Sequence, residues 1–137
     1  MKPALLAILV PLACLGLSPL AGAETDQAVE AAKSWLELVD SKKYRESWEE
    51  AAPFFKEKVS EAIWVKMVAS VRDPLGEVKS RDLIGAQYAT SLPGAPPGEY
   101  VVIQFRTSFQ NKPGAIETVT PMKDDKGAWK VSGYYIK

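Results

Sequence analysis

The sequence predicts an α+β domain in which three N-terminal helices pack on a four-stranded antiparallel meander sheet. Apolar residues recur at steps of three and four up to Gly76, which indicates amphipathic helices, and at steps of two beyond it, which indicates strands. Helices followed by strands are typical of a sheet that is covered by helices on one face.

The first predicted helix runs from Thr25 to Val39. Its apolar positions share one face, namely Ala28, Ala32, Trp35, Leu36 and Val39. The second begins after Ser41 as N-cap and ends before Pro53, because a proline disfavours helical backbone in the residue that precedes it. Its expected buried face is Tyr44, Ser47, Trp48 and Ala51.

The third predicted helix runs from Lys56 to Val71 and ends at the Arg72–Gly76 turn, where Pro74 and Gly76 stop it. Its apolar stripe is Val59, Ile63, Met67 and Val71. Trp64 lies just off this stripe, so we expect it to be partly exposed. Turns rich in Pro, Gly or Asp separate the four predicted strands, which are Glu77 to Thr90, Glu99 to Phe109, Ala115 to Met122 and Ala128 to Ile136.

Residues 1–23 have the features of a cleaved export signal. Lys2 is followed by an apolar run from Ala4 to Leu17, and small residues at positions 21–23 predict cleavage between Ala23 and Glu24. Residues 24–137 are then one domain of 114 residues, large enough for a core without disulfides. The predicted location is the periplasm or the medium.

Two alternatives concern the same segment. Leu12-Ala13-Cys14 resembles a lipoprotein signal, so membrane attachment is expected only if Cys14 is acylated. A retained transmembrane helix is disfavoured, because Pro11 and Pro19 interrupt the apolar run.

The composition narrows the candidate chemistry. The chain has no histidine, and Cys14 is its single cysteine, so the exported domain has neither imidazole nor thiol. This disfavours thiolate nucleophiles, His-assisted serine hydrolysis and Cys/His metal cages, and we expect no cofactor and no metal. Removal of Lys2 leaves 16 basic and 17 acidic residues, a net charge of −1 that argues against nucleic-acid binding.

Glu117 is the candidate site residue, because the expected strand pairing places it on the core side of the sheet. A turn centred on residues 124–127 puts Glu117 opposite Gly133 and Val119 opposite Val131, while the preceding turn puts Thr107 opposite Glu117. The small Gly133 leaves room above the sheet, and Thr107 supplies a hydrogen-bond donor.

Either Arg81 or Asp82 lies level with Glu117, depending on the first turn. Arg81 is the better neighbour, because a guanidinium satisfies a buried carboxylate. One interpretation is the polar floor of a ligand pocket, whose expected aromatic walls are Trp35, Phe105, Trp129 and Tyr135. The simpler interpretation is a structural ion pair.

The opposite face of the sheet mixes apolar and polar side chains and is a candidate homodimer interface. Its expected members are Tyr100, Val102, Gln104, Arg106, Ile116, Thr118, Tyr134 and Ile136.

Several motifs across the mature chain resemble the exported bacterial family called domain of unknown function 4019. They are Trp35-Leu36 with Asp40, Tyr44-x-x-Ser47-Trp48, Arg72-x-Pro74-Leu75-Gly76, Leu92-Pro93-Gly94, Gly98-Glu99-Tyr100-Val101-Val102, Glu117-Thr118-Val119 and Trp129-x-Val131-x-Gly133-Tyr134. The resemblance implies no activity. The order of elements is also similar to the cystatin-like, nuclear-transport-factor-2-like cone, in which a curved sheet wraps a long helix and often encloses a pocket.

The expected function is a non-catalytic binding or accessory domain of the cell envelope, with a small ligand or an envelope protein as partner. The alternative is a small-molecule enzyme that uses Glu117 or Asp82 as a general base near Arg81. A third possibility is a structural protein without a pocket.

Overall fold

In the computed structural model, which describes residues 19–137, four helices precede four strands. The helices are α1 (Pro19–Asp40), α2 (Tyr44–Glu49), α3 (Pro53–Lys58) and α4 (Glu61–Leu75). The strands are β1 (Val78–Ala89), β2 (Tyr100–Phe109), β3 (Lys112–Lys123) and β4 (Trp129–Ile136). The α+β class and the four strands are therefore confirmed, whereas the expected number of helices is wrong.

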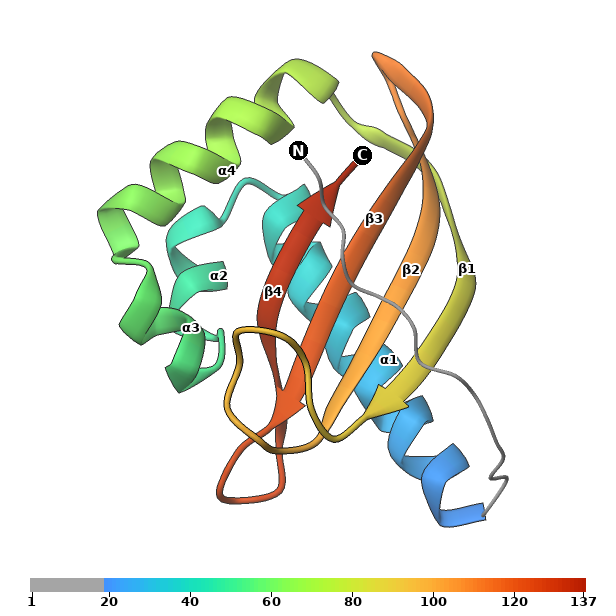
Figure 1. Cartoon of the computed structure of the whole chain (residues 1–137). Coiled ribbons are helices and arrows are strands. Elements are labelled where there is room, and N and C mark those ends of the chain that lie inside the picture. The colour runs from blue at the N-terminus through green and yellow to red at the C-terminus, as the bar shows by residue number, and fades with distance from the viewer. Residues whose placement is uncertain (1–18) are drawn as a thin grey trace.

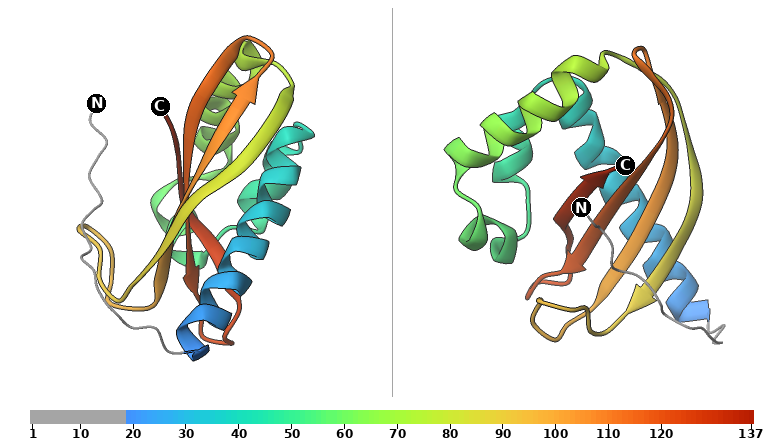
Figure 2. Two further views of the ribbon diagram at one scale, coloured as in Figure 1. Left: turned by 90° about the vertical axis from the view of Figure 1, so that its right-hand side faces the viewer. Right: turned by 45° about the horizontal axis from the view of Figure 1, so that its top comes forward.

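The strands form one antiparallel sheet in the order β1-β2-β3-β4, the predicted meander. Helix α1 crosses one face of the sheet and contacts all four strands, and the shorter helices gather beside β4 (Figure 1). The views in Figure 2 show the sheet twisting over α1. The core lies between this helix and the sheet.

The packing of α1 follows the predicted face. All five of its expected core positions are buried, namely Ala28, Ala32, Trp35, Leu36 and Val39. They pack against inward-facing apolar residues of the strands, which include Ile103, Phe105, Val119 and Val131. Alanines at two of these positions let the helix approach the sheet closely, while Trp35 fills the wider space toward α2.

The predicted second and third helices need correction. Ser41 does not cap α2, because the N-cap is Lys43, and Pro53 is the first residue of α3 rather than a stop. The third predicted helix is interrupted at Val59, whose backbone is extended, and restarts at Ser60, whose Oγ accepts a hydrogen bond from the Ile63 backbone amide. A serine N-cap thus divides the segment into α3 and α4.

Helix α4 buries a different face from the one predicted. Ile63, Met67 and Val71 are each about half exposed, whereas the buried residues are Trp64, Val68 and Arg72. Trp64 is 5 % exposed, and its indole Nε1 donates to Ser47 Oγ at 2.9 Å. The indole and the guanidinium both find polar partners inside the fold, and these partners set the rotation of the helix more strongly than the aliphatic stripe does.

The predicted register of the sheet is wrong in detail. Thr107 pairs with Ala115, and Phe105 pairs with Glu117. This two-residue shift from the predicted pairing leaves each side chain on its predicted face, because side chains alternate with a period of two.

The β3–β4 pairing changes the face of the last residues. Val119 pairs with Tyr134 and Pro121 with Val131, so β4 has one extra residue at this point. Pro121 has no amide hydrogen for the ladder, which accounts for a bulge here. Beyond the bulge Tyr134 therefore points to the helix side, and Tyr135 points away.

The bulge also alters the expected dimer face. Tyr134 and Ile136 pair with Val119 and Glu117, which face the helices, so neither belongs to the outer face. Tyr100 is buried, and its hydroxyl donates to the Pro96 carbonyl in the loop before β2. The outer face instead includes Val102, Gln104, Arg106, Ile116, Thr118 and Tyr135. A homodimer through this smaller face stays a prediction.

The predicted export signal, residues 1–23, lies largely outside the described residues. Helix α1 begins at Pro19, so it includes the predicted cleavage position between Ala23 and Glu24. No helix within residues 19–137 is long and apolar enough to cross a membrane.

Candidate functional site

Six elements of the fold contribute one side chain each to a buried polar cluster. Its members are Asp40 of α1, Arg72 of α4, Arg81 of β1, Thr107 of β2, Glu117 of β3 and Tyr134 of β4. We call this set the polar cluster.

Glu117 is the centre of the polar cluster and has no solvent exposure (0 %). Its Oε1 accepts from Thr107 Oγ1 at 2.6 Å and from Arg81 Nε at 2.8 Å. Its Oε2 accepts from the Tyr134 hydroxyl and from Arg81 Nη2 at 3.3 Å. Both oxygens are therefore satisfied twice, which is what a buried carboxylate requires.

Asp40 joins the two arginines. Its Oδ1 accepts from Arg72 Nη2 at 2.9 Å and from Arg81 Nη2 at 3.0 Å, and its Oδ2 accepts from Arg81 Nη1 at 2.8 Å. The order Arg72–Asp40–Arg81–Glu117 alternates in sign and sums to zero. Asp40, with its side chain 25 % exposed, is the most exposed of these four charged groups.

Arg72 is held in two further ways. Its Nη1 donates to the Tyr134 hydroxyl at 3.3 Å, and its guanidinium lies over the Phe109 ring at 4.9 Å. Its Nε has no hydrogen-bond partner among the described residues. Contact with the aromatic ring offsets part of the cost of burying this cation.

The electrostatics agree with the geometry. Burial raises the pKa of Tyr134 well above its usual value, and the negative charge of Glu117 raises it further. For Arg81, burial by itself would lower the pKa, but the hydrogen bonds that Arg81 donates to Asp40 and Glu117, with the negative charges of both, outweigh burial and raise the pKa. Both shifts keep the tyrosine neutral and the arginine charged at ordinary pH.

The structure brings together only some of the predicted site residues. Glu117, Arg81 and Thr107 meet as expected, and Arg81 pairs with Thr107 in the sheet. Trp35 reaches the cluster through Tyr134, since the two rings meet edge to face with centroids 5.3 Å apart. Asp82 lies opposite Arg106 and is exposed.

Two predicted site residues lie elsewhere. Gly133 does not face Glu117, because the bulge places it beside Thr120, and Tyr135 pairs with Thr118 and is 37 % exposed. Tyr134 takes the position expected for Tyr135. The error is one residue, and it follows from the bulge at Pro121.

Sequence reasoning missed Asp40, Arg72 and Tyr134 as cluster members. Helical spacing contained a signal for two of them: Asp40 is four residues after Leu36, and Arg72 is four residues after Val68, so both continue buried rows. All three also belong to the motifs that carried the family resemblance.

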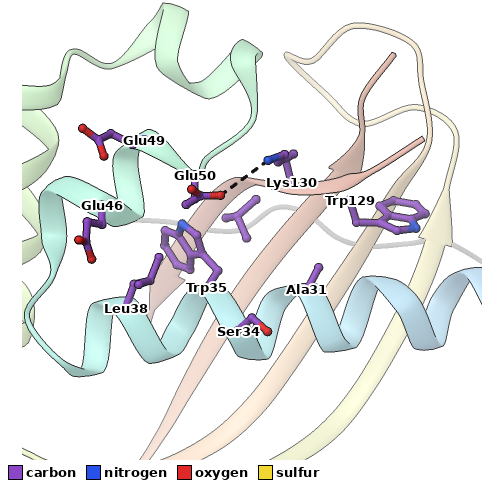
Figure 3. Close-up of a pocket in the computed structure, with 10 residues that line it drawn as sticks. Ala31, Ser34, Trp35, Leu38, Glu46, Glu49, Glu50, Trp129 and Lys130 are labelled. Atoms are coloured by element: carbon purple, nitrogen blue, oxygen red, sulfur yellow. Dashed lines mark ion pairs between the residues drawn. The ribbon is translucent and has the colours of Figure 1, made fainter. Parts of the chain in front are cut away.

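A groove open to solvent lies on another part of the molecule, between α1, α2 and β4 (Figure 3). Its volume is about 530 Å³. The residues that line it are Ala31, Ser34, Trp35 and Leu38 of α1, Glu46, Glu49 and Glu50 at α2, and Trp129, Lys130 and Val131 of β4. None of the six cluster residues lines it.

The floor of the groove is rigidly held. Trp35 Nε1 donates to the Ser47 carbonyl at 2.8 Å, and Ser47 Oγ in turn accepts from Trp64 and donates to the Tyr44 carbonyl at 2.6 Å. On the strand side, the Ala52 amide donates to the Val131 carbonyl at 2.8 Å. These bonds tie α2 to α1 and the segment after α2 to β4.

The walls of the groove are acidic on the α2 side. Glu50 pairs with Lys130 at 3.7 Å across the groove, as the dashed line in Figure 3 shows, and Glu49 pairs with Arg45 at 3.6 Å. Glu46 has no ion-pair partner among residues 19–137.

The two regions differ in what they can do chemically. Both oxygens of Glu117 are already bonded and Glu117 is closed to solvent, so this carboxylate offers no free base. The groove offers the partly exposed side chains of Ala31 and Leu38 next to exposed carboxylates of α2. Within the described part of the chain, no group of three or more Asp, Glu, Cys or His side chains is arranged to hold a metal ion.

A search of curated protein sequences found no match to this chain. The family described as "Protein of unknown function (DUF4019)" matches residues 31–134. This range contains all ten groove residues and all six residues of the polar cluster. The chain belongs to this family.

Proposed function

We propose that the protein is a non-catalytic binding or accessory domain of the cell envelope, and that its binding site is the groove between α1, α2 and β4. The observation that carries the proposal is the open groove itself, with apolar side chains at its floor and charged groups at its walls. Its volume of about 530 Å³ falls within the range of roughly 300–1,000 Å³ typical of ligand sites.

The polar cluster supports a role in binding rather than catalysis. A general base needs a free lone pair within reach of a substrate. Glu117 has four hydrogen bonds and no exposed surface, so it fits the structural ion pair that was the simpler of the two expectations. Asp82 lies on the outer face, away from Arg81.

The cystatin-like cone belongs to the same proposal. It is supported by the long helix α1 that lies across a twisted four-stranded meander (Figure 2). Envelope location is supported by the sequence of residues 1–23 alone.

The enzyme alternative predicts an activity that depends on Glu117. A Glu117→Gln variant that folds and loses turnover of some substrate, with a bell-shaped pH profile in the wild type, would favour the enzyme over the binding domain.

The test of the proposal is a thermal-shift screen of small envelope metabolites and short peptides with the exported domain. We expect at least one compound to stabilise the wild type and to lose this effect in Ser34→Arg, because the long side chain enters the groove from an exposed position on α1.

Ser70→Arg is the matched control, because it makes the same substitution on an exposed helical position of α4, outside the groove. It should keep the full thermal shift. Compounds whose shifts are equal in both variants, or a screen in which no compound stabilises the wild type, would contradict the groove as the binding site.

A further inference from the structure

We infer that the groove binds a short peptide segment of a partner protein in which a basic residue stands beside an apolar one. This inference rests on the proposed function and names the chemistry of its ligand. The observation that supports this ligand is the acidic wall formed by α2, whose negative charge is complementary to a basic side chain.

The charges around the groove are unequal in sign. Three carboxylates line it, from Glu46, Glu49 and Glu50, and Lys130 is the one basic residue among the ten that line it. The Glu50 and Lys130 groups pair at 3.7 Å with side chains 64 % and 35 % exposed, and exposed pairs of this kind bind each other weakly. An incoming ammonium or guanidinium therefore finds carboxylates whose own partners hold them loosely.

The direction of α2 adds to this field. Glu49 and Glu50 stand at its C-terminal end, where the helix dipole and the last carbonyls favour a cation. The chain itself uses this property: Lys56 Nζ donates to the Glu49 carbonyl at 2.9 Å and lies 5.6 Å from the centre of the Trp48 ring.

The floor calls for an apolar neighbour to the cation. Ala31 and Leu38 supply partly exposed apolar surface between the acidic wall and β4, and the buried side chains of Trp35 and Val131 lie beside them. An apolar side chain such as leucine would remove the exposed part of Ala31 and Leu38 from water, which favours binding. A ligand that has a cation but no apolar neighbour would leave the apolar floor of the groove in contact with water.

The shape of the groove favours a segment of chain over a compact solute. It is open to solvent. Its α1 residues, from Ala31 to Leu38, follow one another along the helix beside α2 and β4 (Figure 3), so the ends of a bound peptide can leave it. The volume of the groove suits a few residues of a peptide and is too small for a whole amphipathic helix.

The test is an NMR titration of the isotope-labelled domain with an acetylated, amidated pentapeptide that alternates lysine and leucine. Two comparison peptides replace lysine by glutamate or leucine by glycine. We expect the lysine–leucine peptide to shift the backbone amides of Ala31, Ser34 and Lys130 in a saturable way, and both comparison peptides to bind the groove at least tenfold more weakly.

The double variant Glu46→Gln/Glu49→Gln should weaken the lysine–leucine peptide about fivefold, since each exposed charge contributes modestly. Glu30→Gln/Glu37→Gln is the matched control. It also removes two exposed carboxylates, one with an ion-pair partner, from a helix surface outside the groove, and it should bind like the wild type.

The outcomes separate this inference from the proposed function. If the glutamate–leucine or lysine–glycine peptide binds the groove as well as the lysine–leucine peptide, or both double variants behave alike, the basic–apolar occupant is wrong although the groove still binds. The same holds if screened compounds bind the groove and the lysine–leucine peptide does not. If no compound and no peptide shifts the NMR signals of the groove amides, the proposed function and this inference are both wrong.

Discussion

The polar cluster and the groove use the same kinds of side chain in opposite ways. In the cluster, two arginines and two carboxylates saturate one another, and Glu117 is closed to solvent. In the groove, the carboxylates of α2 stay exposed and are paired loosely or have no pair among the described residues. Charge that is satisfied internally fixes a fold, whereas charge left in water beside an apolar floor remains available for a partner.

The comparison also shows why the position of a charged residue in the sequence is a poor guide to its role. Glu117 and Glu46 both stand among mixed polar and apolar residues in the sequence. What separates them is the number of elements that converge: six on the cluster, and three around the groove. The following predictions test this division.

The largest expected effect comes from Arg81→Met. The substitution leaves Glu117 buried without its bidentate partner, and it removes two of the three hydrogen bonds that Asp40 accepts from the two arginines. Breaking a buried pair in this way costs about 3–5 kcal/mol of unfolding free energy. Urea denaturation measures it.

Arg106→Met is the control for that change, because Arg106 is on the neighbouring strand and exposed on the outer face. Its effect should stay within about 0.5 kcal/mol. Equal losses in the two variants would mean that the cluster does not hold the fold together.

The next effect distinguishes two adjacent tyrosines. Tyr134→Phe removes the hydroxyl that donates to Glu117 and accepts from Arg72, and should cost about 1–3 kcal/mol. Tyr135→Phe alters an exposed hydroxyl on the outer face and should cost less than about 0.5 kcal/mol. Denaturation of both variants in the same buffer tests the position of the β4 bulge as well as the cluster, because the reverse order of losses would place Tyr135 inside.

A smaller effect appears at alkaline pH. The folded-state pKa of Tyr134 is raised above the usual value of 10.0, so above that pH the unfolded chain releases the phenolic proton first. Stability is then fully present below pH 10.0 and is lost as the pH rises through the higher folded pKa. Unfolding free energies measured at a series of alkaline pH values should show this fall.

In Tyr134→Phe the slope of that fall should be shallower by up to one proton, about 1.4 kcal/mol per pH unit. A fall remains, because burial and the hydrogen bond to Asp73 raise the pKa of Tyr44 to about 12. An unchanged slope in the variant would show that the Tyr134 hydroxyl is not buried against Glu117.

The smallest effect on stability is expected in the groove. Ser34 is exposed, and no hydrogen bond involves its side chain among the described residues, so Ser34→Arg should change the unfolding free energy by less than about 0.5 kcal/mol. A loss comparable to that of Tyr134→Phe would mean that the groove is part of the structural core.

The sequence predicted most of the architecture because two periods dominate it. The buried row of α1 and the four strands of the meander lie where alternation and helical spacing place them. The sequence did not predict the division of the third helix, because Ser60 acts as an N-cap only when the backbone of Val59 is extended. The sequence did not predict which face of α4 is buried, because this depends on hydrogen-bond partners of Trp64 and Arg72 that are distant in the sequence.

The polar cluster was predictable in part. Glu117, Arg81 and Thr107 lie on adjacent strands, and the alternation of side chains put them on one face even though the predicted Thr107–Glu117 pair was wrong. Tyr134 was missed because one bulge reverses the face of the last β4 residues. The groove could not be predicted from the sequence. Its lining residues come from α1, α2 and β4, and the periodicity of each element does not say how separate elements pack together.

The most direct test of the division between the two regions is peptide binding by Tyr134→Phe and Ser34→Arg, both kept at a temperature where each is folded. The measurement is the dissociation constant of the lysine–leucine pentapeptide, followed through the amide of Lys130. We expect Tyr134→Phe to bind within about twofold of the wild type although it is less stable, and Ser34→Arg to lose binding although it is as stable as the wild type. Lost binding in Tyr134→Phe together with retained binding in Ser34→Arg would contradict the account and return the site to the polar cluster.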